Sequence, residues 1–409
     1  MVELLGEDKK VRNERIRLLL FFIYPFAAFI LALNSLKSKF SFIIIFLFFV
    51  LFGLTFIAQN KSADSYHYVE DFNSYKKVST SQYINDLKAF FTFQSNIKDI
   101  YTISSYYLVS RITANYHILM ALWAIVFSFF FLKAFRFFVD RPEFKKSLVV
   151  SLLAFLFIYS NNIFNINGVR FYTAAWIAVY AIFEIVVNKN YKFVFLALIT
   201  PLIHISYVSL VGVLLIYVLT IKYDKFWAIL FFISFFMSEI SIVLIQNTNQ
   251  FLPLALQNMV WDYTEGSNLL KRMDSFNTLP LYAKILTSLP RYYINFLMFV
   301  LIFNSKYIKS LPEARYVYVF LLIWLSFTNF AIAIPSFGAR FITIAIPLIT
   351  YICLLCYSKI SSLPKLIYLI PFVFSYQILY WFRDIITVTD PFLIISLFPH
   401  LLIKNLLSI

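Results

Sequence analysis

The stretch "NINGVRFYTAAWIAVYAIFEI", residues 165–185, decides the class of this chain. It begins with polar residues and an arginine, Arg170, and then stays apolar for long enough to enter a lipid bilayer. The rest of the chain has the same character, since 61% of its 409 residues are hydrophobic, 21% are aromatic and only 13% are charged. Soluble proteins carry about 25% charged residues. A membrane span must satisfy its own backbone hydrogen bonds, so the sequence predicts an all-α polytopic integral membrane protein.

Apolar stretches of about 20 residues recur along the chain and predict about 11 to 13 transmembrane helices in a single transmembrane domain, residues 1–409. They cover residues 17–35, 40–58, 116–132, 147–164, 171–188, 193–220, 226–247, 291–304, 314–334, 340–357, 364–382 and 391–408. The stretch 193–220 is too long for one crossing, and Pro201 and His204 interrupt it. This predicts two short helices or one broken helix beside a polar cavity.

Two longer loops, at about residues 59–115 and 248–290, mix tyrosines with charges of both signs. Such loops are expected to hold amphipathic helices that lie on the membrane surface. Short loops rich in Lys and Arg favour the cytoplasmic side, and they lie at residues 133–146, 188–192, 222–225, 305–310 and 358–365. The longer loops and the turns around Arg170 and Arg340 are then external. The same bias accounts for the net charge of +15, so no nucleic-acid partner is expected.

Familiar soluble catalytic motifs are missing from the sequence. It contains no Walker A loop, no GxGxxG, no GxSxG and no HExxH, so ATP-driven transport has no support. The four histidines are scattered, and the two cysteines lie within an apolar run. This pattern predicts neither a zinc site nor another metal or cofactor.

Arg170 and Arg340 share a local setting that predicts an anion site. In each case polar residues, a glycine (Gly168 or Gly338) and one small or β-branched residue precede the arginine, and Phe and an apolar helix follow. The glycines permit a tight turn at the start of the helix. Each arginine falls in the first helical turn, where N–H groups and the dipole favour an anion, and its guanidinium fits two phosphate oxygens. The alternative is an interfacial arginine that reaches lipid headgroups.

His204 and Asp64 are candidates for proton transfer. His204 lies in "ITPLIHISYVS", and a histidine within an apolar span suggests a polar cavity or a proton-transfer role. The alternative is a structural histidine bonded to a neighbouring helix. Asp64 follows a span in "KSADSYHY" and suits a general base or a clamp for a sugar hydroxyl. The alternative is a solvated loop acid.

Four stretches resemble the EpsG-like, Wzy-type polysaccharide polymerases, which build O-antigen, capsule or exopolysaccharide from lipid-linked repeat units. They are Asp64–Tyr68, "NGVRFYTAAWIAVYAIF", "YKFVFLALITPLIHISYVSLVGVLLIY" and "SFGARFITIAIPLITYI". Their order and spacing match the family along most of the chain. One departure concerns the early acid, which in the family often has an arginine a few residues before it and a tyrosine directly after it. Lys61 and Ser65 occupy those places here.

The resemblance implies a GT-C-like, multi-pass glycosyltransferase of the bacterial inner membrane, with its active site facing the periplasm or cell exterior. The donor would be a glycan on undecaprenyl pyrophosphate, the acceptor one lipid-linked repeat unit, and a chain-length regulator protein would be a further partner. Arg170 and Arg340, with Arg291 as a third cation, would neutralise the pyrophosphate without a metal. His204 or Asp64 would deprotonate or orient the acceptor. Other substrate contacts would come from Lys61, Tyr66, Tyr68, Asn167 and Tyr172.

Two other functions fit a membrane protein of this kind. An O-antigen ligase shares external arginines and a histidine, but the Arg170 and His204 stretches are similar to the polymerase type. A flippase for lipid-linked oligosaccharides would be expected to place several charges deep within its helices and to show related halves. Here the charges lie at the outer ends of spans and the halves do not visibly repeat.

Overall fold

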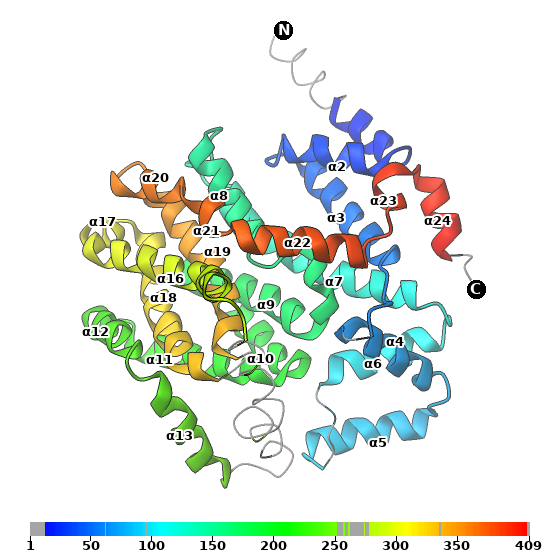
Figure 1. Ribbon diagram of the computed structural model, residues 1–409, viewed down its shortest axis with the longest axis horizontal. Coiled ribbons are helices and arrows are strands. Elements are labelled where there is room, and N and C mark those ends of the chain that lie inside the picture. The colour runs from blue at the N-terminus through cyan, green and yellow to red at the C-terminus, as the bar shows by residue number, and fades with distance from the viewer. Residues whose placement is uncertain are drawn as a thin grey trace.

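The computed structural model describes residues 13–61, 63–94, 97, 99–251, 257, 261, 274, 278–334 and 337–406. These residues are almost entirely helical, as Figure 1 shows. Within this part of the chain, the extended pairing is limited to one antiparallel bridge between Phe56 and Thr389. The predicted all-α class is therefore confirmed.

The helices are mostly short, and several are joined by 3₁₀ or π-helical turns. Up to residue 187 they are α2 (Pro25–Leu33), α3 (Lys39–Leu54), α4 (Asp64–Tyr75), α5 (Thr80–Phe91), α6 (Ile100–Ser110), α7 (Tyr116–Val139), α8 (Leu148–Tyr159), η1 (Ile163–Gly168), α9 (Val169–Ile182) and the π-helical η2 (Phe183–Val187). From residue 191 to 249 they are η3 (Tyr191–Phe193), α10 (Val194–Ile203), η4 (Ile205–Tyr207), α11 (Val208–Thr220), α12 (Asp224–Ser234) and α13 (Ser238–Asn249). The last part forms α16 (Leu281–Phe303), α17 (Ser305–Lys309), α18 (Pro312–Phe330), η5 (Ala331–Ala333), α19 (Gly338–Cys356), α20 (Ser362–Ile367), α21 (Ile370–Val373), α22 (Ser375–Val388), α23 (Phe392–Ile395) and α24 (Phe398–Leu406).

Local sequence signals explain where several of these helices begin. The side chains of Ser38, Asn115 and Ser147 accept hydrogen bonds from backbone N–H groups in the first turns of α3, α7 and α8. Such caps satisfy donors that a helix start leaves unpaired. Pro25 and Pro312 lie at the first positions of α2 and α18, where a proline removes no helical hydrogen bond. Pro25 therefore breaks the first predicted span instead of lying within one straight helix.

Among the described residues, six helical segments are long and apolar enough to cross a membrane, which confirms a multi-pass membrane protein. They are Tyr116–Val139, Leu148–Val187, Leu281–Phe303, Pro312–Ala333, Gly338–Cys356 and Ser362–Val388, and shorter apolar helices cover Lys39–Leu54, Tyr191–Ile203 and Ile205–Thr220. The predicted 11 to 13 spans do not correspond one to one with these segments. Some predicted spans form helices that are too short for this count, and others lie together in one continuous helical segment. Two predicted spans lie within the 40-residue segment Leu148–Val187, and a break between α12 and α13 divides the stretch 226–247.

The interruption predicted within residues 193–220 is present. Pro201 lies inside α10, which ends at Ile203, and His204 takes an extended conformation before η4 and α11. The proline lacks the N–H that a continuous helix would need. The stretch is therefore two short helices with a histidine at the junction.

The predicted external loop 59–115 is a helical layer. It contains α4, α5 and α6, which lie together at the lower right of Figure 1. The second predicted loop, 248–290, falls mostly outside the described residues, and its last part is already helix α16.

Loops that were predicted to share one side of the membrane do contact one another. Arg141 forms an ion pair with Glu313, and Lys309 forms one with Asp224. Lys189 lies 4.5 Å from the centre of the Tyr316 ring. These contacts lie beyond the end of α9 and at the start of α18, whereas Arg170 lies at the start of α9. The basic loops and Arg170 therefore occupy opposite ends of the helical bundle.

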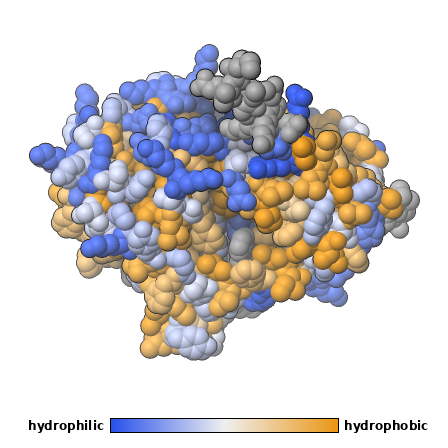
Figure 2. Space-filling view, turned by 90° about the horizontal axis from the view of Figure 1, so that it is seen from above, coloured by the Kyte–Doolittle hydropathy of each residue, from blue (hydrophilic) through white to orange (hydrophobic). Residues whose placement is uncertain are grey.

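The surface carries the large hydrophobic side chains that a bilayer would cover. Phe236 is 86% exposed and Leu219 is 70% exposed, and many other exposed apolar residues come from α10 to α12 and α22. Figure 2 shows extensive hydrophobic surface in its lower part and hydrophilic side chains gathered toward the top. Apolar surface of this extent is typical of a membrane-embedded protein.

Candidate functional site

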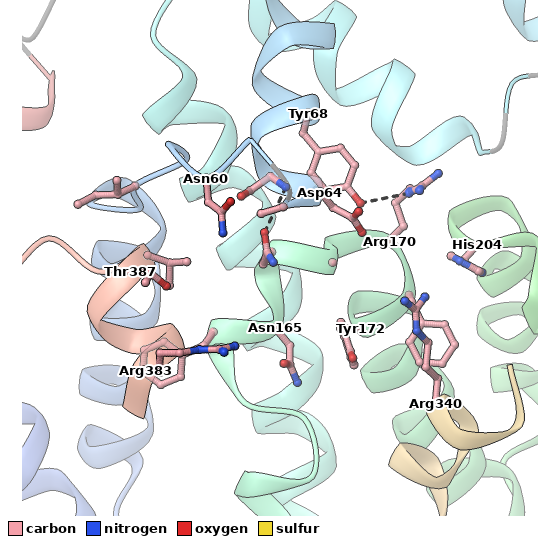
Figure 3. A pocket seen from close by; sticks show the side chains of 18 residues that line it. Asn60, Asp64, Tyr68, Asn165, Arg170, Tyr172, His204, Arg340, Arg383 and Thr387 are labelled. Atoms are coloured by element: carbon pink, nitrogen blue, oxygen red, sulfur yellow. Dashed lines mark hydrogen bonds between the residues drawn. The ribbon is translucent and has the colours of Figure 1, made fainter. Parts of the chain in front are cut away.

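Residues from distant parts of the sequence line one cavity of about 410 Å³ (Figure 3). Its walls come from the segment before and within α4, from η1 and the start of α9, from the α10–η4 junction, and from the start of α19 and the end of α22. Seven of the ten predicted site residues line it, namely Asp64, Tyr68, Asn167, Arg170, Tyr172, His204 and Arg340. Their roles stay predictions, but the structure brings them together.

The other three predicted residues do not line the cavity. The side chain of Lys61 is exposed, and Tyr66 packs its ring against His67 at 5.8 Å between ring centres. The guanidinium of Arg291 lies 4.5 Å from the centre of the Tyr292 ring on α16. Arg291 was predicted as a third cation, but no residue of α16 lines the cavity.

Several residues of the cavity wall were not predicted, and they include Asn60, Asn165, Arg383 and Thr387. Arg383 is the strongest omission. It lies in "YWFRDII", just beyond the predicted span 364–382, so its position beside an apolar run was a signal of the same kind as that of Arg170. Another omission, Asp99, lies behind Arg170, and no sequence motif marks it.

Arg170 belongs to a buried network. Its Nη1 donates to Asp99 Oδ2 at 3.1 Å and its Nε donates to the Tyr68 hydroxyl at 3.3 Å. Asp99 is 2% exposed on its side chain, and its Oδ1 accepts hydrogen bonds from the backbone N–H and the hydroxyl of Thr102, each at 2.7 Å. The carboxylate therefore both caps α6 and holds the guanidinium in one orientation.

Burial shifts the ionisation of both acidic partners of Arg170. Desolvation raises the pKa of the Asp99 carboxyl, although Arg170 and the hydrogen bonds from Thr102 oppose the shift. Desolvation also raises the pKa of Tyr68 to about 12, against the pull of Arg170. Tyr68 therefore keeps its proton near neutral pH and can donate a hydrogen bond into the cavity. The positive charge of Arg170 is partly neutralised by the Asp99 carboxylate.

Arg340 is in a different electrostatic state from Arg170. Its guanidinium lies 5.8 Å from the centre of the Phe171 ring, and within the described residues it has neither a carboxylate nor a hydrogen-bond acceptor as a partner. The two arginines share a sequence setting and a positive charge, but only Arg170 has a carboxylate partner among the described residues. Of the pair, only Arg340 has its whole charge available to a ligand.

His204 shares an aromatic support with Arg340. The Phe171 ring packs edge-on to His204 with 5.4 Å between ring centres, and it also contacts Phe341, which follows Arg340 in α19. The hydroxyl of Tyr207 donates to the carbonyl of Phe171 at 2.9 Å. His204 Nδ1 is 2.7 Å from Ser206 Oγ. The contact with Ser206 helps to orient the imidazole at the cavity wall, in the region where Figure 3 shows Arg170 and Arg340.

Asp64 is held at the cavity by its neighbour in the chain. It is the first residue of α4, and the backbone N–H of Ser65 donates to Asn167 Oδ1 at 3.2 Å. Ser65 itself is 1% exposed. This bond joins α4 to η1 at the point where Asn167 also lines the cavity. The layer formed by α4 to α6 and the start of α9 therefore form one continuous wall.

The two glycines have different roles from the ones predicted. Neither adopts a positive φ, so neither turn requires the left-handed region. A Cβ at Gly168 would meet the Tyr172 ring at 3.1 Å, whereas a Cβ at Gly338 would lie 2.5 Å from the carbonyl oxygen of Ala331. Gly338 is therefore needed because η5 passes directly against the start of α19. The turn leading to Arg170 also differs, because η1 runs straight into α9.

Gly338→Ala is expected to destabilise the protein by about 1 to 3 kcal/mol, since overpacking forces backbone shifts. The matched control is Gly212→Ala within α11, where a Cβ would meet nothing within 4 Å. That control should be neutral or slightly stabilising, because alanine favours helix more than glycine does. Thermal unfolding of the purified variants in detergent measures both effects. Equal unfolding temperatures for the two variants would contradict the close approach at Gly338.

A family model described as the EpsG family matches residues 39–394, which is most of the chain. Proteins of that family are Wzy-type polymerases. The matched range includes every residue of the cavity wall. No curated protein and no solved structure shows significant similarity to the chain.

Proposed function

Because the chain belongs to the EpsG family, we propose that it joins lipid-linked oligosaccharide repeat units into a surface polysaccharide. The family supports a polysaccharide polymerase-type role in general. The finer proposal is a glycosyl transfer in which both substrates are carried on undecaprenyl pyrophosphate, with no metal. The observation that supports it is the cavity in which Arg340, Arg170 and His204 meet.

The proposed reaction needs few groups from the protein. A hydroxyl of the acceptor sugar attacks the anomeric carbon of the donor, a new glycosidic bond forms, and the bond from that carbon to pyrophosphate oxygen breaks. The lipid pyrophosphate leaves with the electron pair, and the proton of the hydroxyl passes to a base. The protein must therefore stabilise negative charge on the leaving group and accept one proton.

The different partners of the two arginines suggest different roles for them in this reaction. Arg340 has no carboxylate partner among the described residues, so we assign it the pyrophosphate. Arg170 shares its charge with Asp99, and we assign it the orientation of the same group together with the Tyr68 hydroxyl. Pre-placed donors of this kind act most strongly where water is excluded.

His204 is the proposed base. Imidazole is the side chain whose ordinary pKa lies closest to neutral pH, and the contact of Nδ1 with Ser206 orients the ring. Asp64 is exposed and is proposed to bind and orient a sugar hydroxyl. The proposed location is the bacterial inner membrane, with the cavity open to the periplasm or cell exterior. A chain-length regulator protein is a proposed partner.

Reconstitution tests this function. The purified protein, given only the lipid-linked repeat unit from its host, is expected to produce a ladder of longer glycans without nucleotide sugar, and to do so in the presence of a chelator. Loss of the ladder on chelation would contradict the metal-free reaction. Transfer of a finished glycan to another acceptor without a ladder would indicate a ligase. Movement of the lipid between leaflets of liposomes without joining would indicate a flippase.

A further inference from the structure

A second chamber of about 440 Å³ adjoins the cationic cavity and shares Asn165 and Tyr172 with it. Its volume is that of a typical small-molecule pocket. Tyrosines, amides and hydroxyls from six helical segments line it, and Tyr159, Asn162, Thr287, Thr343, Tyr376 and Gln377 are among them. Within the described part of the chain, its lining includes no Asp, Glu, Lys or Arg. The cavity with the arginines and this neutral chamber therefore differ in charge but share a wall.

One face of α22 passes along both spaces. Tyr376 and Tyr380 line the neutral chamber, while Arg383 and Thr387 line the cationic cavity. These positions are four, three and four residues apart, so they form a single stripe on the helix. A ligand lying along this stripe would meet tyrosines at one end and a guanidinium at the other.

The neutral chamber has the chemistry that binds sugars. Aromatic faces offer apolar surface to sugar rings, and amides and hydroxyls can donate to and accept from sugar hydroxyls. Gln377 Nε2 donates to the carbonyl of Leu286 at 2.8 Å, whereas its Oε1 is buried and has no donor among the described residues. A buried acceptor without a donor is costly, and a sugar hydroxyl would supply that donor.

We propose that the neutral chamber binds uncharged sugar residues of the lipid-linked glycan while its pyrophosphate lies in the cationic cavity. The stripe on α22 then sets the position of the glycan relative to the reacting carbon, and Arg383 contacts the anionic end. This inference rests on the proposed function, because it takes the ligand of the cationic cavity to be a lipid pyrophosphate.

Binding measurements on the full-length protein in nanodiscs test the proposal with two probes. One is undecaprenyl pyrophosphate without sugar, and the other is the same lipid carrying the repeat unit of the host. Tyr376→Ala and Thr343→Val are each expected to weaken binding of the sugar-bearing probe about 10-fold, which corresponds to about 1.4 kcal/mol. Binding of the sugar-free probe should not change. Thr343→Val keeps the shape of its side chain, so it remains informative if the tyrosine variant fails to fold.

Phe382→Ala is the matched control, because it removes an aromatic ring from the same helix at a position that lines neither space and is 56% exposed. It should bind both probes as wild type does. Unchanged affinity of Tyr376→Ala and Thr343→Val for the sugar-bearing probe would overturn the chamber proposal alone. Failure of the wild-type protein to bind either probe would instead overturn the proposed function.

Discussion

Arg340→Ala is expected to lower the rate of glycan extension by about 100-fold or more while leaving the amount of folded protein unchanged. Removing one donor that stabilises charge on a reacting group typically has an effect of this size. The variant should leave little strain behind, because Arg340 has no ion pair within the described residues and contacts the Phe171 ring. The measurement is the ladder of glycan lengths from purified protein and host lipid-linked repeat unit.

Arg291→Ala is the matched control for Arg340→Ala, since Arg291 carries the same charge but lies outside the cavity. It is expected to give a wild-type ladder. Arg340→Lys should also be poor, because an ammonium cannot bind two oxygens in parallel as a guanidinium does. A wild-type ladder from Arg340→Ala would remove this residue from the proposed site.

Arg170→Ala is expected to reduce both glycan extension and the stability of the protein. It leaves the buried Asp99 carboxylate without its cation, and loss of one partner of a buried ion pair costs about 3 to 5 kcal/mol. Burial raises the pKa of the Asp99 carboxyl, and loss of Arg170 removes a charge that opposes this shift, so the folded variant binds the proton more tightly than the unfolded chain does. Stability from this source is therefore lost as the pH rises through the pKa of the folded state. The unfolding temperature of the variant should therefore increase as the pH falls.

The double variant Arg170→Ala with Asp99→Asn separates the two effects. Removing the uncompensated carboxylate should restore most of the lost stability, since the amide keeps an acceptor for Thr102. Glycan extension should stay low, because the guanidinium is still missing. A double variant with wild-type extension would show that Arg170 acts only by neutralising Asp99 and has no role toward substrate.

The sequence alone was enough to predict those site residues that a short local sequence pattern marks. Arg170 and Arg340 each sit at the start of an apolar stretch, and Pro201 marks the helix break that exposes His204, so hydropathy and one proline suffice to find them. The helical class follows in the same way, because a bilayer leaves the backbone no other partner. Residues with a local signal could therefore be recognised without the fold.

The remaining residues depend on contacts between distant segments. Asp99 is recognisable only through its ion pair with Arg170, which requires α4 to pack against η1 and α6 to pack against α7 and α10. Arg291 has a local pattern similar to that of the true cavity residues, but α16 carries it elsewhere. Hydropathy also does not show where a short break divides an apolar stretch, so the bounds of the individual helices could not be predicted. Local sequence therefore indicates which residues are candidates for a site, but it does not show which residues they contact in the folded protein.

The bridge between Phe56 and Thr389 has a consequence for how the protein is made. The N–H of Ile57 donates to the carbonyl of Val388 at 2.9 Å, so the segment after α3 closes against the end of α22. Both segments line the cationic cavity. A ribosome therefore delivers Arg170, His204 and Arg340 to the membrane before the wall that completes their cavity exists. The cavity is therefore complete only after α22 has been made and has closed against the segment that follows α3.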